Sequence, residues 1–163
     1  MRYSAFIFIL IIIHSLFANA QKVYDFQLKN PNGKTERFSD YTGEKFTVID
    51  FWATWCKPCV NSIPKLVELS EKYDKEEVAF IGISVDSPRN ISKVKPFTKS
   101  VGINYPILLD TKQEIMGELN VVAVPTLLII NSNKEIVYIH EGFAPGDEDV
   151  IEQEIKQLLT VYE

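Results

Sequence analysis

The sequence is poor in the side chains that bind metals and cross-link proteins. Its 163 residues include only two cysteines and two histidines. A structural zinc site needs four ligands, and Cys56, Cys59 and His140 cannot supply them. Exported proteins that rely on cross-links usually carry several disulfides. We therefore expect no metal, and a fold held together by a hydrophobic core.

The sequence also has no excess of basic residues. Seventeen Lys and Arg residues stand against 22 Asp and Glu residues, for a net charge of −5. Affinity for nucleic acids rests largely on basic side chains that neutralise phosphates. No basic patch interleaved with aromatic residues is present. We expect no nucleic-acid partner.

The first twenty residues have the organisation of a secretory signal peptide. A positive charge at Arg2 precedes an apolar run over residues 5–13, and a small-x-small pattern ends at Ala20. The apolar run is shorter than the roughly 20 residues that span a membrane. We expect residues 1–20 to be cleaved after Ala20, with an uncleaved anchor as the alternative, and residues 21–163 to form one domain.

The order of the apolar segments predicts an α/β domain with a central mixed sheet and helices on both faces. An N-terminal β-hairpin is expected around residues 29–34, because Asn-Gly favours a tight turn. The remaining elements are expected in the order strand 46–53, helix 56–73, strand 77–86, helix 89–102, short strand 105–110, short helix 112–119, strands 124–131 and 135–142 as a hairpin, and helix 147–159.

Cys56 and Cys59 stand at the junction of a predicted strand and helix. A disulfide between them closes a very small loop and stabilises the fold little. Backbone N–H groups and the helix dipole favour a thiolate at Cys56 and lower its pKa. Lys57 adds a positive charge beside it, and Pro58 lies with Lys57 at the helix start. This spacing favours reversible thiol–disulfide exchange over half of a zinc site or a purely structural disulfide.

Asp50 is the single charged residue in an otherwise apolar predicted strand, six residues before Cys56. No Lys or Arg in the neighbouring strand "VAFIGIS" can pair with it, so burial should raise its pKa. We predict that it accepts the proton of Cys59. A structural aspartate near the strand end is the alternative.

Val124-Pro125-Thr126 opens another apolar strand. A proline cannot donate a hydrogen bond to a sheet, so the tripeptide by itself indicates only a strand start.

The segment "DFWATWCKPC" with the later "VPT" resembles the thioredoxin superfamily, and most closely the extracytoplasmic TlpA/ResA-like thiol-disulfide oxidoreductases. The resemblance implies a thioredoxin fold with an N-terminal β-hairpin and an inserted α/β segment. It implies that Cys56 is the nucleophile and Cys59 the resolving thiol. It also implies a cis Pro125 that faces the disulfide. The Val124 backbone would pair with an extended substrate, and Trp55 would border the docking surface.

Three positions depart from that family. Ser62 stands where many ResA-like members have a glutamate. Asp50 stands where those members commonly have an uncharged residue. Thr126 stands where the cytochrome-maturation branch usually has a glutamate, which disfavours assignment to that branch.

The expected function is that of a periplasmic thiol-disulfide oxidoreductase acting on protein disulfides. We expect a monomeric reductase with no cofactor besides the redox-active disulfide, supplied with electrons by a membrane thiol reductase. Alternatives are an oxidase of exported proteins, a binding module without redox turnover, and a holdase or isomerase-like factor. A peroxiredoxin is disfavoured because its Pro-x-x-x-Thr-x-x-Cys setting is missing.

Overall fold

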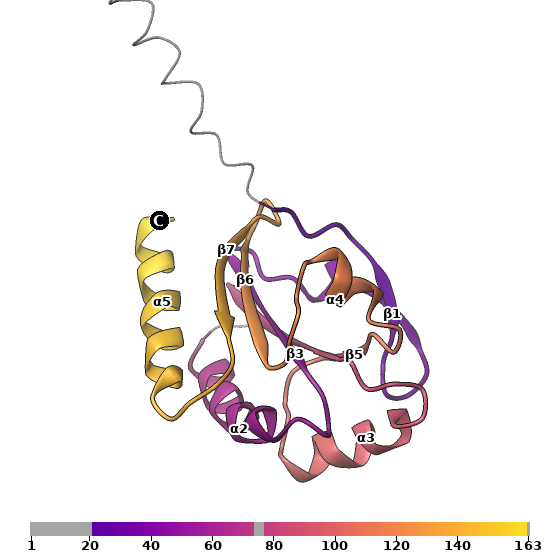
Figure 1. Ribbon diagram of the computed structural model, residues 1–163. Coiled ribbons are helices and arrows are strands. Elements are labelled where there is room, and N and C mark those ends of the chain that lie inside the picture. The colour runs from indigo at the N-terminus through magenta and orange to yellow at the C-terminus, as the bar shows by residue number, and fades with distance from the viewer. Residues whose placement is uncertain (1–20, 74–76, 163) are drawn as a thin grey trace, which may run out of the picture.

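In the computed structural model, which describes residues 21–73 and 77–162, seven strands form one mixed sheet with helices on both faces (Figure 1). The expected signal peptide lies outside the described residues. The sheet order is β2-β1-β5-β4-β3-β6-β7. The strands are β1 (Gln27–Lys29), β2 (Thr35–Arg37), β3 (Phe46–Trp52), β4 (Val78–Ser84), β5 (Ile107–Leu109), β6 (Thr126–Asn131) and β7 (Ile136–Glu141). The helices are the 3-10 helix η2 (Phe38–Tyr41), α2 (Lys57–Lys72), α3 (Ile91–Ser100), α4 (Glu114–Glu118) and α5 (Asp147–Val161).

Strand β3 is the centre of the sheet, and all seven of its residues are buried. It pairs in parallel with β4 and antiparallel with β6. A strand covered on both faces has no need to alternate polar and apolar residues. This explains why "FTVIDFW" is nearly continuous in its apolar character and why its single carboxylate is unusual.

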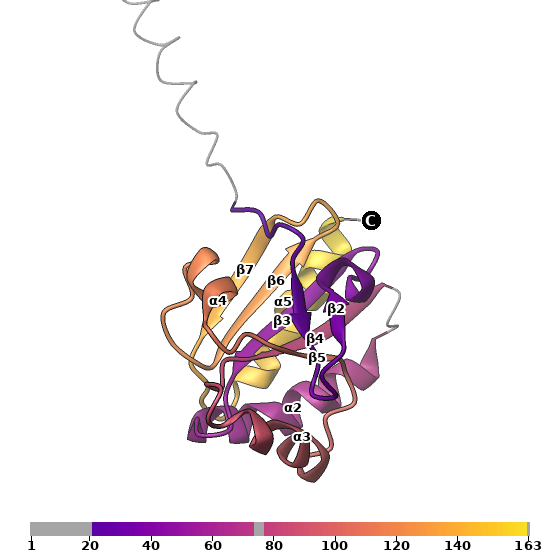
Figure 2. The same ribbon diagram turned by 90° about the vertical axis from the view of Figure 1, so that its right-hand side faces the viewer.

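One face of the sheet is covered by α2, α3 and α5. Asp50 and Trp52 point to the same face because they are two residues apart on β3. Trp52 stacks on Phe97 of α3 with ring centroids 5.3 Å apart. Asp50 shares a small cavity with Ser62 of α2 and Ile151 of α5. Helix α4 lies on the opposite face, and Figure 2 shows α5 behind the strands. The expected mixed sheet with helices on both faces is confirmed.

The expected N-terminal hairpin is present as β1 and β2, which pair antiparallel. Gly33 adopts a φ of +83° in the turn, a conformation that glycine reaches without strain. Strand β1 also pairs with Leu109 of β5 through Lys29. The hairpin therefore extends the sheet beyond the expected inserted segment, which is formed by α3 and β5.

The first described residues fasten the chain to the turn between β6 and β7. The N–H of Val23 donates to the Lys134 carbonyl at 2.8 Å, and the N–H of Ile136 donates to the Gln21 carbonyl at 2.9 Å. This turn lies beside the start of β3, because Phe46 is in register with Asn131. It is therefore at the opposite end of the sheet from Cys56, which follows the last residue of β3.

Candidate active site

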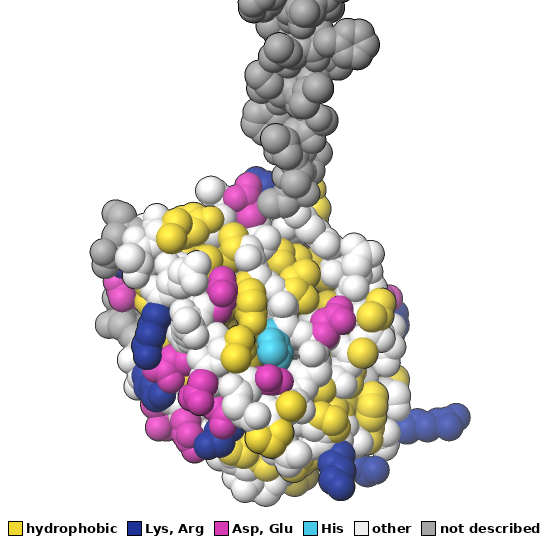
Figure 3. Space-filling view, turned by 60° about the vertical axis from the view of Figure 1, so that its left-hand side comes forward, with side chains coloured by type: hydrophobic (Ala, Val, Ile, Leu, Met, Phe, Trp, Pro, Cys, Tyr) yellow, Lys and Arg dark blue, Asp and Glu magenta, His cyan; other side chains and the backbone are white. Residues whose placement is uncertain are grey.

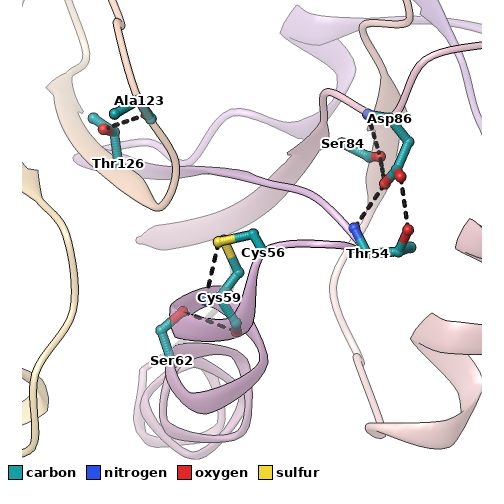
Figure 4. Close-up of a disulfide and its surroundings, with 8 residues drawn as sticks. All are labelled: Thr54, Cys56, Cys59, Ser62, Ser84, Asp86, Ala123 and Thr126. Carbon is teal, nitrogen blue, oxygen red and sulfur yellow. Dashed lines mark hydrogen bonds between the residues drawn. A yellow bond between two sulfur atoms is a disulfide. The ribbon is translucent and has the colours of Figure 1, made fainter.

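Cys56 and Cys59 form a disulfide at the start of α2 (Figure 4). Cys56 is the N-cap residue of the helix, and its Sγ accepts a hydrogen bond from the N–H of Cys59 at 3.2 Å. Pro58 lies in the first turn, where its missing N–H leaves no intrahelical bond unmade. The start of the helix thus directs a backbone donor at the sulfur of Cys56.

The two sulfurs differ in access to solvent. Cys56 is 4% exposed and Cys59 is completely buried. Lys57 and Pro58 are exposed beside them. Of the pair, Cys56 is the sulfur that an incoming group could reach first.

Asp86 fixes the loop that leads into Cys56, a contact that sequence reasoning missed. Its carboxylate accepts from the Thr54 N–H at 2.8 Å, from the Thr54 hydroxyl at 2.6 Å and from the Ser84 hydroxyl at 3.0 Å. Asp86 follows β4 by two residues, and nothing in its local sequence connects it to Thr54. The available signal was a threonine inside the apolar "FWATWC" segment, facing the end of the adjacent parallel strand.

Asp50 is buried in the middle of β3, in register with Gly82 on one side and Leu127 on the other. It is 3% exposed, and its Oδ2 has no hydrogen-bond partner among the residues that the structure describes. Removal of the carboxylate from water raises the pKa of Asp50 to about 7. The predicted rise in pKa, for lack of a basic partner, is confirmed.

A cavity of about 10 Å³ lies against Asp50 and is also lined by Ser62, Pro125 and His140. The Ser62 hydroxyl donates to the Cys59 carbonyl at 3.1 Å. Ser62 therefore joins the first turns of α2 to the cavity, at the position where the resembling family often has a glutamate. The volume is close to the smallest that admits one water molecule.

The peptide bond between Val124 and Pro125 is cis, as the resemblance implied. Thr126 lies next to Phe51 of β3 in the sheet register, which brings this segment to the end of β3 that leads to the disulfide. The Thr126 hydroxyl donates to the Ala123 carbonyl at 2.9 Å and holds the bend (Figure 4).

The backbone N–H and carbonyl of Val124 make no hydrogen bond to any part of the chain that the structure describes. Trp55 is 60% exposed and Val122 is 81% exposed. Free backbone groups beside exposed apolar side chains can receive an extended peptide by strand addition.

Two further buried polar atoms face the region of Asp50. The Trp52 Nε1 and the Tyr105 hydroxyl have no hydrogen-bond partner within the described residues. Both approach Gly82: a Cβ on this glycine would lie 3.0 Å from Trp52 Nε1 and 3.3 Å from a ring carbon of Tyr105. Burial, and next the charge of Asp50, raise the pKa of Tyr105 well above its ordinary value.

His140 lies on β7, whereas Cys56 and Cys59 lie at the start of α2. Its Nε2 is 3.1 Å from Asp147 Oδ2, and its Nδ1 is 3.3 Å from the Tyr138 hydroxyl. No group of three or more His, Cys, Asp or Glu side chains able to hold a metal is found among residues 21–73 and 77–162. Within the same residues, no helix has the length and apolar character needed to cross a bilayer.

Comparisons with known proteins agree with this geometry. A sequence model of the AhpC/TSA family matches residues 20–139. The chain is 35% identical over 118 residues to the thiol-disulfide oxidoreductase ResA of Geobacillus kaustophilus, an alignment that covers 72% of this chain and 66% of that protein. It is 28% identical over 137 residues to ResA of Bacillus subtilis, covering 80% of this chain and 75% of the relative.

Among solved structures, a Chlorobium tepidum protein provisionally named thiol:disulfide interchange protein DsbE superposes with a TM-score of 0.76 at 28% identity. The superposition covers 86% of this chain and 96% of that one. The chain spans just under two thirds of the length of the Geobacillus relative.

Proposed function

The chain belongs to the AhpC/TSA family, and on that premise we propose that it is a thiol-disulfide oxidoreductase that exchanges its Cys56–Cys59 pair with protein disulfides. The observation that carries the proposal is the Cys59 N–H directed at Cys56 Sγ at the start of α2. A donor and a helix N-terminus at this position stabilise a thiolate on Cys56 when the pair is reduced. Relatives named thiol-disulfide oxidoreductase support the same activity.

In the reductive direction the reaction has two displacements. The Cys56 thiolate attacks a substrate disulfide, forms a mixed disulfide and releases the first substrate thiolate. Cys59 then loses its proton and attacks the Cys56 sulfur, which releases the second substrate thiolate and closes the Cys56–Cys59 disulfide. Two electrons pass from the protein dithiol to the substrate disulfide.

Asp50 is the base in this proposal. A carboxyl with a pKa of about 7 can accept the proton of Cys59 near neutral pH and release it again. The hydrogen bond from Ser62 to the Cys59 carbonyl and the shared cavity support this assignment, because they connect Asp50 to the turn that carries Cys59.

The substrate segment docks in extended form against the free backbone of Val124, beside the cis Pro125. Exposed Trp55 supplies apolar contact area. Recognition through main-chain hydrogen bonds depends little on the substrate sequence, so we infer broad acceptance of protein and peptide disulfides.

We further propose that the protein acts as a monomer in the periplasm, as one domain over residues 21–163 after removal of residues 1–20. Electrons come from a membrane thiol reductase, with no cofactor beyond the disulfide. A dithiol oxidase is the alternative direction. Equilibration with glutathione buffers separates the two, because a reductase has a potential near that of thioredoxin and an oxidase a much less negative one.

The catalytic assignment is tested with insulin as the disulfide substrate. Cys56→Ser abolishes reduction because the attacking sulfur is gone, and Cys59→Ser accumulates a mixed disulfide detectable by mass spectrometry. The reverse pattern would exchange the two roles. Unchanged cellular function with alanine at both positions would instead indicate a binding module without redox turnover.

A further inference from the structure

We propose that His140 is the surface end of a proton path that begins at Asp50 and crosses the small cavity between them. The inference deepens the proposed function and rests on it, because it concerns the proton that Cys59 gives to Asp50. The sequence offered no reason to connect these two residues, which lie 90 positions apart.

The register of three strands places the two side chains on one face. Asp50 of β3 is opposite Leu127 of β6, and Leu127 is opposite His140 of β7. Side chains directly opposite one another point to the same face of a sheet. Asp50 and His140 therefore flank Leu127 beneath the same helices.

A small cavity lies beside the row formed by Asp50, Leu127 and His140. Asp50, Ser62 and His140 all line it, and its volume of about 10 Å³ is near the lower limit for one water molecule. Asp50 contributes a buried oxygen that no described residue satisfies. A single water with polar neighbours on both sides is the carrier that this space admits.

The outer end of the path reaches solvent. In Figure 3 the cyan histidine side chain, the one histidine among the described residues, reaches the surface beside acidic side chains. The side chains of His140 and Asp147 are 17% and 27% exposed. The Nε2 atom of His140 is itself buried and makes no hydrogen bond within the described residues, but it lies 3.1 Å from Oδ2 of Asp147, so the Asp147 carboxylate is the group that meets solvent. Imidazole is the side chain that ordinarily gains and loses a proton between pH 5 and 8.

Each transfer along the path has a named donor and acceptor, and no further reagent is needed. Cys59 gives its proton to Asp50 and becomes the attacking thiolate. Asp50 then gives that proton to the cavity water, and His140 takes it from the water. The proton leaves His140 for solvent by way of the Asp147 carboxylate. The titratable groups around His140 are Asp147 from α5, Tyr138 on its own strand, and Asp50 across Leu127, while Glu154 of α5 acts on Tyr138.

A second exit, over Gly82 to Tyr105, is disfavoured. Burial and the charge of Asp50 raise the pKa of the Tyr105 hydroxyl well above its ordinary value, so this hydroxyl keeps its proton near neutral pH. The cavity that Asp50 lines does not include Tyr105, and the cavity of about 190 Å³ that Tyr105 lines does not include Asp50.

The test follows single-turnover oxidation of the reduced protein by dithiobis-nitrobenzoate. The reagent releases one coloured thiolate when Cys56 attacks and a second when Cys59 resolves the mixed disulfide. His140→Gln should slow the second release about tenfold at pH 7 and leave the first unchanged. Added imidazole should restore part of the lost rate.

Glu141→Gln is the matched control, because Glu141 is the next residue of β7 and points to the opposite face. It should change neither release. An unchanged second release in His140→Gln, or slowing by Tyr105→Phe alone, overturns the path. Absence of two releases from the unmodified chain would instead overturn the proposed function.

A nuclear magnetic resonance titration of the unmodified oxidised chain keeps the proposal testable should His140→Gln fold poorly. The His140 ring signals should show an inflection near pH 7 that comes from Asp50. That inflection should vanish in Asp50→Asn. A His140 curve that is identical in both proteins contradicts the path.

Discussion

Asp50 and Asp86 are two carboxylates of nearly equal burial, 3% and 1% exposed, with opposite surroundings. Asp86 accepts three hydrogen bonds from Thr54 and Ser84. Asp50 Oδ2 accepts none from any described residue. The difference follows from their places on the strands: β4 ends just before Asp86, whereas Asp50 lies in the middle of β3.

Backbone N–H groups inside a sheet are already committed to the neighbouring strand, and those of loops remain available to side chains. Asp110, which follows β5, behaves like Asp86 and accepts from the N–H groups of Glu114 and Met116, both at 2.9 Å. The available donors, rather than depth of burial, separate a structural aspartate from one able to exchange protons.

The largest expected effect is a pH-dependent stabilisation by Asp50→Asn in the oxidised protein. The carboxyl titrates near 3.8 in the unfolded chain and at about 7 in the folded one. The folded protein therefore binds more protons in this window, and its stability falls as pH rises. The difference corresponds to at most about 4 kcal/mol.

Urea unfolding at pH 8 should accordingly find the Asp50→Asn variant more stable, with the advantage disappearing below pH 4. An advantage of equal size at both pH values would contradict the raised pKa.

Asp86→Ala should have the next largest effect, in the opposite direction. It removes the acceptor of three hydrogen bonds and leaves the donors of half-buried Thr54 and buried Ser84 without this partner. We expect the free energy of unfolding to fall by about 3 kcal/mol. Asp40 is exposed, so Asp40→Ala, the control, should change it by less than about 0.5 kcal/mol. Equal effects of the two substitutions would show that the hydrogen bonds of Asp86 do not stabilise the fold.

Thr54→Val isolates one of those bonds. It deletes the hydroxyl that lies 2.6 Å from Asp86 Oδ1 and keeps the backbone N–H that lies 2.8 Å from Oδ2. We expect a loss of about 1 kcal/mol in urea unfolding. Thr160→Val on α5 should lose less, because the Thr160 hydroxyl donates to the Lys156 carbonyl of its own helix. A loss as large as that of Asp86→Ala would mean that the side-chain bond alone holds the loop.

The smallest effect is expected for Tyr105→Phe. Its hydroxyl is buried without a partner among the described residues. Removing it therefore removes the free-energy cost of burying an unbonded polar group. Thermal unfolding should report a gain of less than about 1 kcal/mol. A loss above that size would reveal a hydrogen bond to the hydroxyl that solvent supplies.

The order of elements and the disulfide pair could be predicted from the sequence because both depend on local patterns. Apolar runs marked the buried strands, and Asn-Gly marked the N-terminal turn. The raised pKa of Asp50 could also be predicted, since a lone acid in an apolar strand without a basic neighbour must lose solvation. The cis bond before Pro125 could be expected only through family resemblance, because the tripeptide alone does not determine it.

The parts that could not be predicted depend on side chains distant in the sequence. The anchoring of Thr54 by Asp86 joins residues 32 positions apart. The cavity shared by Asp50 and His140 depends on the register of three strands, which hydrophobic periodicity does not specify. The roles of Trp55, Lys57 and Val124 in exchange stay predictions.

Gln21 and Val23 are held at the turn between β6 and β7, so the first described residues and the disulfide lie at opposite ends of the sheet. A surface or tether attached at this end would hold the protein with its disulfide directed away from the attachment. A partner can then approach Cys56 from the opposite end of the sheet, where the attachment does not interfere.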